Sequence, residues 1–555
     1  YFKGGADMVA EVFSGMIQGI EGQIIQIQVD ISNGLPNFYM IGYLSNEVKE
    51  ARERVRTALN NMDILLPPKR ISVNFAPADF RKYGTFFDLG VAVAILLAMK
   101  LIPDTYVKNT LFIGELSLNG QICPVSGVLP ITVAGMKKGI THCIVANENV
   151  AEAAYVEQIQ ATGFDNLKDL YSYLKHGYVI DIDSGEIIET QASKSNSRKR
   201  NDTQQKQIFE VNNESKCKPS IQQLGEFSSE FTKITDFSEV KGQVMAKRAM
   251  EIAAAGYHNL ILGGPPGVGK SMLASCISGI MPQMTQEEMI DTTIIYSSKG
   301  LLKNRFALIT KRPFRAPSLA VTQAGMFGGG TLPKPGEISL AHHGVLFLDE
   351  FPEYNRDIIE MFRIPLEKHE ITIVRKEHTL IFPADFLFIG ALNSCPCGYY
   401  PMEKCHCTHK QIIKYQSKLS GPILDRMDLF VRCEEVGYDV LTSTSKEEES
   451  AVIQKRVENA WEIQKARFSG STTLFNGRMT RWEIDKYCKL DKKSQKLMKK
   501  AFSVLNLTGR SYYKILKVAR TIADLDGNSD IKEPHLEEAL YFRQKEKGGR
   551  HYHDR

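Results

Sequence analysis

A glycine-rich segment limits what this chain can fold into more than any other part of it. It reads Gly264-Pro265-Pro266-Gly267-Val268-Gly269-Lys270-Ser271, which matches the phosphate-binding P-loop pattern at every fixed position. An apolar stretch over 258–263 precedes it, and a helix is expected over 272–280. Because such glycines let backbone N–H groups wrap phosphates at a helix N-terminus, the sequence predicts a site for ATP.

Four polar side chains have separate expected roles at this site. Lys270 is expected to contact the β- and γ-phosphates, and Ser271 to ligate Mg²⁺. Asp349 follows an apolar strand over 345–348 and would hold the same ion through water. Glu350, the next residue, has the position of a base that orients the attacking water. A buried strand followed by a polar loop is the plainer interpretation of this stretch.

A further polar residue ends the next apolar strand. Asn393 follows the strand predicted over 386–392, and its side chain can position the same water. An asparagine at the end of a strand is also a common turn former. Strands that alternate with helix-like or inserted segments are typical of a mostly parallel sheet with helices on its faces.

Helical periodicity dominates the chain from about residue 437. It extends over 452–468, 492–505 and 512–525. Because these helices follow the strands of the predicted sheet, we interpret them as a helical lid.

The first part of the chain mixes strand and helix patterns. Residues 23–29 alternate polar and apolar side chains as a half-buried strand does, and 71–75 is a second strand. Residues 46–60 have apolar positions at helical spacing, and 88–99 is expected to be a buried helix. These patterns predict an α+β domain.

A polar stretch rich in Ser, Asn, Gln and Lys divides the chain, and its composition is that of a flexible linker. We therefore predict an N-terminal domain over 8–185, a linker over 186–230, an ATPase core over 231–436 and a helical lid over 437–545. The segment Tyr1–Asp7 is interpreted as a tag remnant, with Met8 as the native start.

Composition limits the functional classes. The net charge is +5, but five basic residues and one acid give the stretch 192–206 a charge of +4, so any DNA-binding surface must be local. The longest apolar run, 89–99, is shorter than the about 20 residues that span a bilayer, so we expect no membrane segment. Ten cysteines in 555 residues do not suggest a secreted disulfide framework, which favours the cytoplasm.

Four of the cysteines lie close together in the sequence: Cys395, Cys397, Cys405 and Cys407. In a reducing compartment, four such thiols suggest a structural tetrahedral Zn²⁺ site. The spacing is tighter than the usual two-residue gap, and His406 and His409 are alternative ligands. A metal-free loop and redox-sensitive thiols are the other interpretations. The segment 395–407 would brace an insertion in the ATPase core rather than take part in catalysis.

The wider sequence resembles the ComM/YifB group of magnesium-chelatase-like AAA+ ATPases. Besides the P-loop and the strand that ends in Asp349 and Glu350, the resemblance rests on five segments: Phe314-Arg315-Ala316-Pro317, 335–342 (PGEISLAH), 393–399 (NSCPCGY), 421–429 (GPILDRMDL) and 518–525 (VARTIADL). It covers nearly the whole chain outside the linker and the tag.

This resemblance implies a fold and roles for two arginines that composition alone would leave as surface residues. The fold is an α/β AAA+ P-loop module with a helical lid. Asn393 would be sensor 1, Arg510 sensor 2, and Arg426 an arginine finger that acts on the ATP of a neighbouring subunit. A finger supplied in trans requires an oligomer, and the family suggests a homo-hexamer. The implied cofactors are ATP and Mg²⁺.

Two inserted segments resemble parts of related ring helicases that point at DNA in the central channel. Residues 370–382 alternate as a hairpin with Arg375 and Lys376 near its tip, and 322–336 resembles a pore-facing loop. A solvated hairpin and a flexible loop are the alternatives. In a ring, the copies from all subunits would neutralise several phosphates together.

The N-terminal domain resembles the Lon-type protease fold, whose catalytic dyad is Ser–Lys. No serine occurs over 82–90, where the nucleophile would fall, and no lysine over 127–132. We therefore expect no protease activity. The domain also carries basic residues that form either a DNA-facing patch or a solvated helix face: Arg52, Arg54, Arg56, Lys69, Arg70, Arg81 and Lys82.

The function that the resemblance implies is that of a hexameric DNA helicase, which promotes branch migration in homologous recombination during natural transformation. Its partners would be single-stranded or branched DNA, further copies of the chain, and recombination proteins. The alternative is a protein- or cofactor-remodelling ATPase like the motor subunit of magnesium chelatase. The Lon-like domain, the cysteine segment and the basic hairpin favour the DNA motor.

Overall fold

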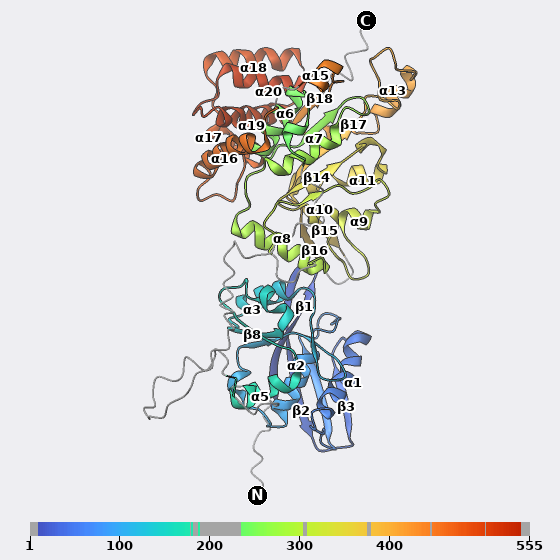
Figure 1. Cartoon of the computed structure of the whole chain (residues 1–555), viewed down its shortest axis with the longest axis vertical. Helices are drawn as coiled ribbons and strands as arrows, with labels where there is room; N and C mark the ends of the chain where they lie inside the picture. Colours follow the sequence, from blue (N-terminus) through green and yellow to red (C-terminus); the bar gives the residue numbers. More distant parts are fainter. Residues whose placement is uncertain are drawn as a thin grey trace. The chain divides into compact units, whose positions relative to one another are not determined.

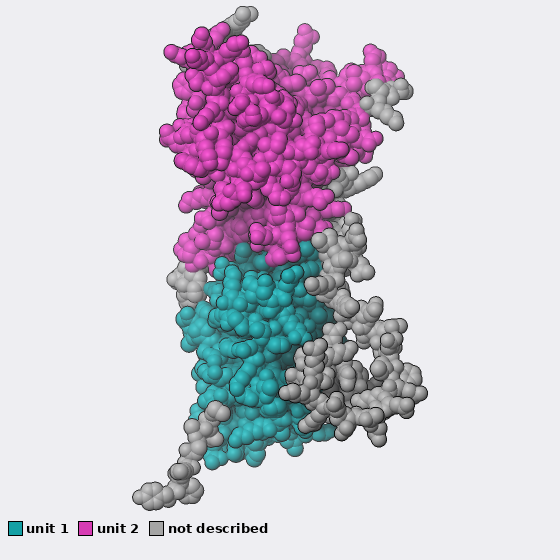
Figure 2. Space-filling view, turned by 90° about the vertical axis from the view of Figure 1, so that its left-hand side faces the viewer, with its two compact units in different colours: residues 1–227, 293–308, 375–378 teal, residues 228–292, 309–374, 379–555 magenta. Residues whose placement is uncertain are grey.

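The computed structural model describes residues 9–177, 179–180, 187–188, 235–302, 308–374, 379–443, 447–505 and 507–544. The chain divides into two compact units, coloured separately in Figure 2. The first comprises residues 1–227, 293–308 and 375–378, and the second comprises 228–292, 309–374 and 379–555. Nearly all of the predicted linker lies outside the described residues, so the predicted domain boundaries stay predictions. In the described ranges, no helix is long and apolar enough to cross a membrane.

The first unit is built on a seven-stranded sheet with the order β3-β4-β2-β1-β5-β8-β9 (Figure 1). Its strands are β1 (Ala10–Gln18), β2 (Glu21–Ser32), β3 (Asn37–Ile41), β4 (Arg70–Ala76), β5 (Thr110–Phe112), β8 (His142–Ala146) and β9 (Gln160–Phe164). The pairs β1–β2 and β2–β4 are antiparallel, and the other neighbours are parallel. Two small antiparallel pairs join β6 (Glu115–Leu116) to β7 (Ile122–Cys123) and β10 (Val179–Ile180) to β11 (Ile187–Ile188).

The helices of this unit follow the predicted apolar spacing. They are α1 (Asn46–Asn60), α2 (Asp88–Ala98), α3 (Val128–Lys137), α4 (Val150–Ala153) and α5 (Leu167–His176), with the 3-10 turns η1 (Asp104–Tyr106) and η2 (Asn147–Asn149). Helix α1 buries one face, whereas α2 is buried on all sides over most of its length, as expected for an apolar run. A sheet with both parallel and antiparallel strand pairs, together with these helices, confirms the predicted α+β domain.

The second unit contains a parallel sheet with the order β13-β14-β17-β12-β18. Its strands are β12 (Leu260–Gly263), β13 (Phe314–Arg315), β14 (Val345–Leu348), β17 (Leu387–Leu392) and β18 (Leu429–Arg432). Every residue of β14 is buried, as expected for a strand of a parallel sheet covered on both faces. A separate antiparallel hairpin joins β15 (Glu370–Val374) to β16 (Thr379–Pro383). The predicted parallel α/β sheet is therefore confirmed.

Helices precede, connect and follow these strands. They are α6 (Val244–Gly256), α7 (Lys270–Cys276), α9 (Gln323–Phe327), α10 (Glu337–Leu340), α11 (Arg356–Met361), α12 (Pro365–Lys368), α13 (His409–Gln416), α14 (Gly421–Leu424) and α15 (Tyr438–Thr442), with the 3-10 turns η4 (Phe237–Glu239), η5 (Ile277–Gly279) and η6 (Phe351–Glu353). Helix α8 (Gln286–Lys299) begins in the second unit, and its residues from Thr293 onward are grouped with the first.

The C-terminal part of the second unit is helical, as predicted, and its helices gather at one end of that unit in Figure 1. It contains α16 (Ser450–Arg467), η7 (Asn476–Arg478), α17 (Arg481–Tyr487), α18 (Lys492–Val504), α19 (Gly509–Leu525) and α20 (Glu533–Gln544). Helix α19 begins three residues earlier than expected, because Thr508 caps it by accepting a hydrogen bond from the Ser511 N–H. This places Arg510 in the first turn of α19.

A buried ion network holds the lid helices together. The carboxylate of Asp524 in α19 is fully buried and pairs with Arg467 of α16 at 2.5 Å and with Arg520 at 2.9 Å. Asn476 in η7 is its third partner and donates a hydrogen bond to it at 2.8 Å. Because a buried charge is stable only when it is paired, Asp524 fixes the packing of three lid elements.

We predict that Asp524→Ala lowers the free energy of unfolding of the lid by about 3–5 kcal/mol, because it leaves two arginines without their buried partner. The two tryptophans of the chain, Trp461 and Trp482, both lie in lid helices. Their fluorescence during urea unfolding therefore reports on the lid. Asp530→Ala, at an exposed position, is the control. An unchanged urea midpoint for Asp524→Ala would contradict the role of the network.

Candidate nucleotide-binding site

The P-loop connects β12 to α7 and turns through glycines. Gly267 and Gly269 have φ angles of +79° and +84°, a region in which a side chain would be strained. A Cβ atom added at either glycine would meet no protein atom within 4 Å, so the loop borders open space there. This glycine backbone leaves room for phosphate groups beside the N-terminus of α7.

Lys270 is the first residue of α7, and its ammonium group has three acceptors. It donates to the carbonyl oxygens of Gly264 at 2.7 Å and Pro265 at 2.9 Å, and to Oδ1 of Asn393 at 2.8 Å. Burial lowers the pKa of Lys270. The structure therefore brings the predicted phosphate-binding lysine and the predicted sensor 1 into direct contact.

The predicted magnesium ligands also meet. Ser271 Oγ donates a hydrogen bond to Oδ2 of Asp349 at 2.6 Å, and the backbone N–H of Glu350 donates to Oδ1 of Asp349 at 2.9 Å. Glu350 itself is exposed and has a φ of 49°, an unusual backbone conformation for a residue with a side chain. A hydroxyl and a carboxylate oxygen are ligands that Mg²⁺ prefers.

The order of the strands explains why residues far apart in the sequence meet. Strand β12 lies between β17 and β18, and β14 lies on the other side of β17. Gly263 pairs with Leu392, and Leu348 pairs with Gly390, so the carboxyl ends of β12, β14 and β17 lie at one edge. Ligands of open α/β sheets bind at this edge, at the strand where the order reverses.

The predicted arginine finger, Arg426, and the predicted sensor 2, Arg510, share one acidic partner. Arg426, just after α14, donates to the carbonyl oxygens of Arg363 at 2.9 Å and Pro422 at 2.8 Å, and it pairs with the Glu367 carboxylate. Arg510 lies 3.7 Å from the other oxygen of Glu367, and its side chain is 60% exposed. Both arginines therefore lie beside the carboxylate of Glu367 in α12.

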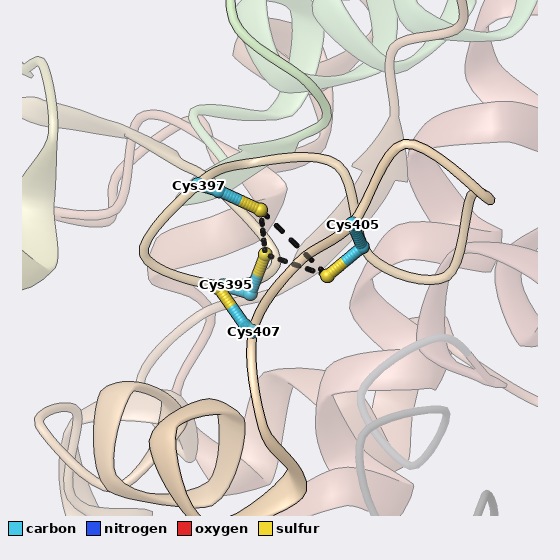
Figure 3. Close-up of side chains that lie close together, drawn as sticks. All are labelled: Cys395, Cys397, Cys405 and Cys407. Atoms are coloured by element: carbon cyan, nitrogen blue, oxygen red, sulfur yellow. Dashed lines mark hydrogen bonds between the residues drawn. The ribbon is translucent and has the colours of Figure 1, made fainter.

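The four clustered cysteines surround a common centre (Figure 3). Their Sγ atoms all lie within 4.8 Å of one another. The separations are 3.3 Å between Cys395 and Cys397, 3.7 Å between Cys395 and Cys405, and 3.6 Å between Cys397 and Cys405. A hydrogen bond from the backbone of Tyr399 lowers the pKa of Cys397 to about 6. The arrangement is compatible with a four-thiolate metal site.

Comparison with known proteins identifies the family of the chain. Family models described as magnesium chelatase subunit ChlI, subunit ChlI of Mg-chelatase, and the subunit ChlI C-terminal region match residues 236–441, 27–149 and 447–543. The chain is 38% identical over 538 residues to competence protein ComM of Haemophilus influenzae, which covers 96% of this chain and 97% of ComM. It is 35% identical to YifB of Salmonella typhimurium, covering 95% of each chain.

The chain belongs to the ComM/YifB family of magnesium-chelatase-like AAA+ ATPases. The family implies ATP and Mg²⁺ as cofactors. The geometry fits both, because the P-loop borders open space and the Ser271 hydroxyl lies beside the Asp349 carboxylate. Lon protease 2 of Bacillus subtilis is a more distant relative, 26% identical over 41% of this chain and 46% of its own length.

The structure corrects the list of basic residues in the N-terminal unit that form either a DNA-facing patch or a solvated helix face, because two of them are held by partners within the protein. Lys82 is buried, and its ammonium donates to the carbonyl oxygen of Phe80 at 2.8 Å and to that of Pro77. Arg54 pairs with the buried carboxylate of Asp88 at 2.6 Å. Neither side chain is free to bind a phosphate. The remaining five basic residues of the predicted patch are exposed.

The two residues predicted to bind DNA, Arg375 and Lys376, lie outside the described residues, between β15 and β16. The described strands do form the predicted antiparallel hairpin. In the predicted pore-facing loop, α9 is followed by a bridge between Gly329 and Lys334. Contact of either segment with DNA stays a prediction.

The structure also identifies site residues that sequence reasoning missed. Gln243, just before α6, donates to the carbonyl oxygens of Glu434 at 2.7 Å and of Val268 in the P-loop at 3.4 Å. Glu367 is the shared partner of the two arginines. The residues that Gln243 and Glu367 contact lie roughly 25 to 190 residues away from them in the sequence. Periodicity and local motifs therefore could not predict these contacts.

We predict that Lys270→Ala weakens ATP binding about 10- to 100-fold, because a charge-assisted hydrogen bond to phosphate contributes about 1.5–3 kcal/mol. Titration of a fluorescent ATP analogue measures the dissociation constant. Lys410→Ala, at an exposed position of α13, removes one positive charge away from the P-loop and is the control. Equal affinities for the two variants would show that Lys270 does not bind the nucleotide.

Proposed function

We propose that this chain forms a homo-hexameric ring in the cytoplasm that uses ATP to move DNA, as a helicase that promotes branch migration in homologous recombination during natural transformation. The observation that carries the proposal is 38% identity to competence protein ComM over 96% of the chain, in a family of AAA+ ATPases. The nucleotide site supports it, because residues for phosphate, magnesium and water all meet at one sheet edge.

The contacts of Lys270 suggest how the site would respond to ATP. Its ammonium would exchange two carbonyl partners and Asn393 for the phosphates. Asn393 Oδ1 would then be available to the attacking water, together with the Glu350 carboxylate. Ser271 and Asp349 would hold Mg²⁺, which supplies charge neutralisation at the phosphates. Binding of ATP would thereby assemble the hydrolytic arrangement.

Action in trans by Arg426 would complete the site of a neighbouring subunit. In the single chain, Arg426 is 14% exposed and is held by Glu367 and two backbone carbonyls. To reach a neighbour's γ-phosphate, Arg426 would have to leave Glu367. The negative charge that develops on the γ-phosphoryl group during hydrolysis would replace that carboxylate as its partner. The ring would therefore switch on hydrolysis at each interface where this exchange occurs.

Contact with single-stranded or branched DNA would use the hairpin with Arg375 and Lys376, the loop 322–336, or both. The described part of the hairpin supports this use, since Val374 and Ile381 are 73% and 54% exposed and so have no core to pack against. Copies from every subunit would face one channel and neutralise successive phosphates. Recombination proteins are the protein partners that this activity would require.

We also propose that the four clustered cysteines hold a structural Zn²⁺. In a tetrahedron with zinc–sulfur bonds of about 2.3 Å the sulfur atoms are about 3.8 Å apart. The separations among Cys395, Cys397 and Cys405, 3.3 to 3.7 Å, are close to that edge length, and Sγ of Cys407 lies within 4.8 Å of the other three. Softness of the ligands also favours zinc over magnesium or calcium.

A second candidate function is the remodelling of a partner protein or cofactor complex. The observation that favours it is that all three matching family models are described for subunit ChlI of magnesium chelatase. Such a motor would hydrolyse ATP with the same residues and would not need DNA. DNA dependence of the ATPase rate therefore separates the two functions.

Steady-state ATPase activity with single-stranded, duplex or branched DNA, or without DNA, tests the proposal. We expect branched or single-stranded DNA to stimulate turnover, and Glu350→Gln to abolish it while ATP binding persists, because only the water-orienting carboxylate is lost. Glu353→Gln is the matched control, since Glu353 is a surface residue paired with Lys418. Turnover that is indifferent to every DNA would favour the remodelling function.

Mixing two inactive variants tests action in trans. We expect Arg426→Ala to lower turnover on the order of 10³-fold without loss of ATP binding. Lys270→Ala subunits keep Arg426, and Arg426→Ala subunits keep an intact P-loop. In mixed rings some interfaces combine the intact halves, so the mixture should recover ATPase activity. No recovery, in rings shown to exchange subunits, would place the action of Arg426 within its own subunit.

A further inference from the structure

The segment 394–408, which we call the cysteine loop, has little of its own to hold its shape. It consists of turns and bends between β17 and α13, and only Cys395 and Gly398 are buried in it. A loop of this length without a hydrophobic core needs a cross-link to keep one conformation, because fixing each residue costs conformational entropy. Four thiols around one centre can provide that cross-link if they bind a metal.

The middle of the cysteine loop packs against the P-loop. Gly398 has a φ of +85°, and a Cβ atom placed on it would lie 2.5 Å from Cδ and 3.3 Å from Cγ of Pro266. Only glycine fits there, since a proline ring cannot move aside as the end of a flexible side chain can. The backbone at Gly398 is therefore a support for the third residue of the P-loop.

The start of the cysteine loop is tied to the nucleotide site as well. Asn393, directly before it, accepts a hydrogen bond from Lys270 at 2.8 Å. The carbonyl oxygen of Ser394 accepts a hydrogen bond from Gln416 of α13 at 3.2 Å. The backbone N–H of Tyr400 donates to Cys395 Sγ at 3.4 Å, a contact of the kind that orients metal-bound thiolates.

We propose that zinc in the cysteine loop controls ATP binding, because the metal-locked loop holds Gly398 against Pro266 and thereby keeps the P-loop in its phosphate-binding shape. This inference rests on the proposed zinc site and nucleotide site and adds a regulatory link between them. Loss of the metal frees the loop, removes the support from Pro266 and lowers the affinity for ATP. The cysteine loop is thus a metal-dependent part of the nucleotide site rather than a separate brace.

The first test measures zinc and ATP affinity on the full chain. Elemental analysis of reduced protein should find one zinc per chain. Removal by a zinc-selective chelator in the presence of Mg²⁺ should weaken binding of a fluorescent ATP analogue about tenfold or more, and added zinc should restore it. Cys405→Ser should behave like the chelated protein. Cys123→Ser, at a half-buried cysteine of the first unit, should keep both zinc and affinity.

The second test leaves the four thiols intact. Gly398→Ala should retain one zinc per chain yet weaken ATP binding about tenfold, because the new methyl group pushes Pro266 away. Gly470→Ala is the matched control: its φ is +81°, and no atom lies within 4 Å of the added Cβ. It therefore introduces similar backbone strain without a contact, and its ATP affinity should equal that of the unchanged chain.

Each failure has a distinct signature. Reduced protein without zinc would overturn both the zinc site and this inference. Zinc present, with ATP affinity unchanged by chelation and by Gly398→Ala, would overturn the link alone. Zinc-dependent ATP affinity in a protein whose ATPase ignores DNA would support the link and overturn only the DNA motor.

Discussion

The position of β12 between β17 and β18 is the constraint on which the rest of the nucleotide site depends. Parallel pairing on both sides fixes where β12 ends, and the chain must turn there through glycine into α7. The same pairing brings the end of β17, with Asn393, next to the P-loop. Lys270 then reaches Asn393, and Ser271 reaches Asp349 after β14. The residues predicted to bind phosphate, hold magnesium and orient water thus meet because of one strand order.

A second feature of the molecule is that Lys270 and Arg426 are each held by partners within the chain. Lys270 is held by two carbonyl oxygens and an amide oxygen, and Arg426 by two carbonyl oxygens and a carboxylate. Each is a cation with internal partners, which we propose a phosphate replaces. Oxygen atoms of the protein accept hydrogen bonds from both head groups in the absence of nucleotide, which offsets part of the cost of burying them. Arg510 likewise has a partner within the chain, the carboxylate of Glu367.

The cysteine loop is an insertion that lies against the predicted nucleotide site. It begins directly after Asn393, so its conformation influences the residue that contacts Lys270. At Gly398 it touches the P-loop itself. The N-terminal unit has a different kind of polar interior, in which Arg54 pairs with Asp88 and Lys82 is held by carbonyl oxygens. Those groups stabilise the fold, and they are unavailable to nucleic acid.

The sequence by itself determined the P-loop, the strand before Asp349, the mixed N-terminal domain and the helical C-terminal part, because each is encoded by residues close together in the chain. Patterns of apolar spacing also placed α1 and most lid helices within a few residues. Only the tertiary structure decided that Glu367 joins Arg426 to Arg510, that Gly398 supports Pro266, and that Lys82 is buried. These contacts join distant segments or depend on local burial, which spacing does not encode. The strand order and packing that create them arise only when the whole core assembles.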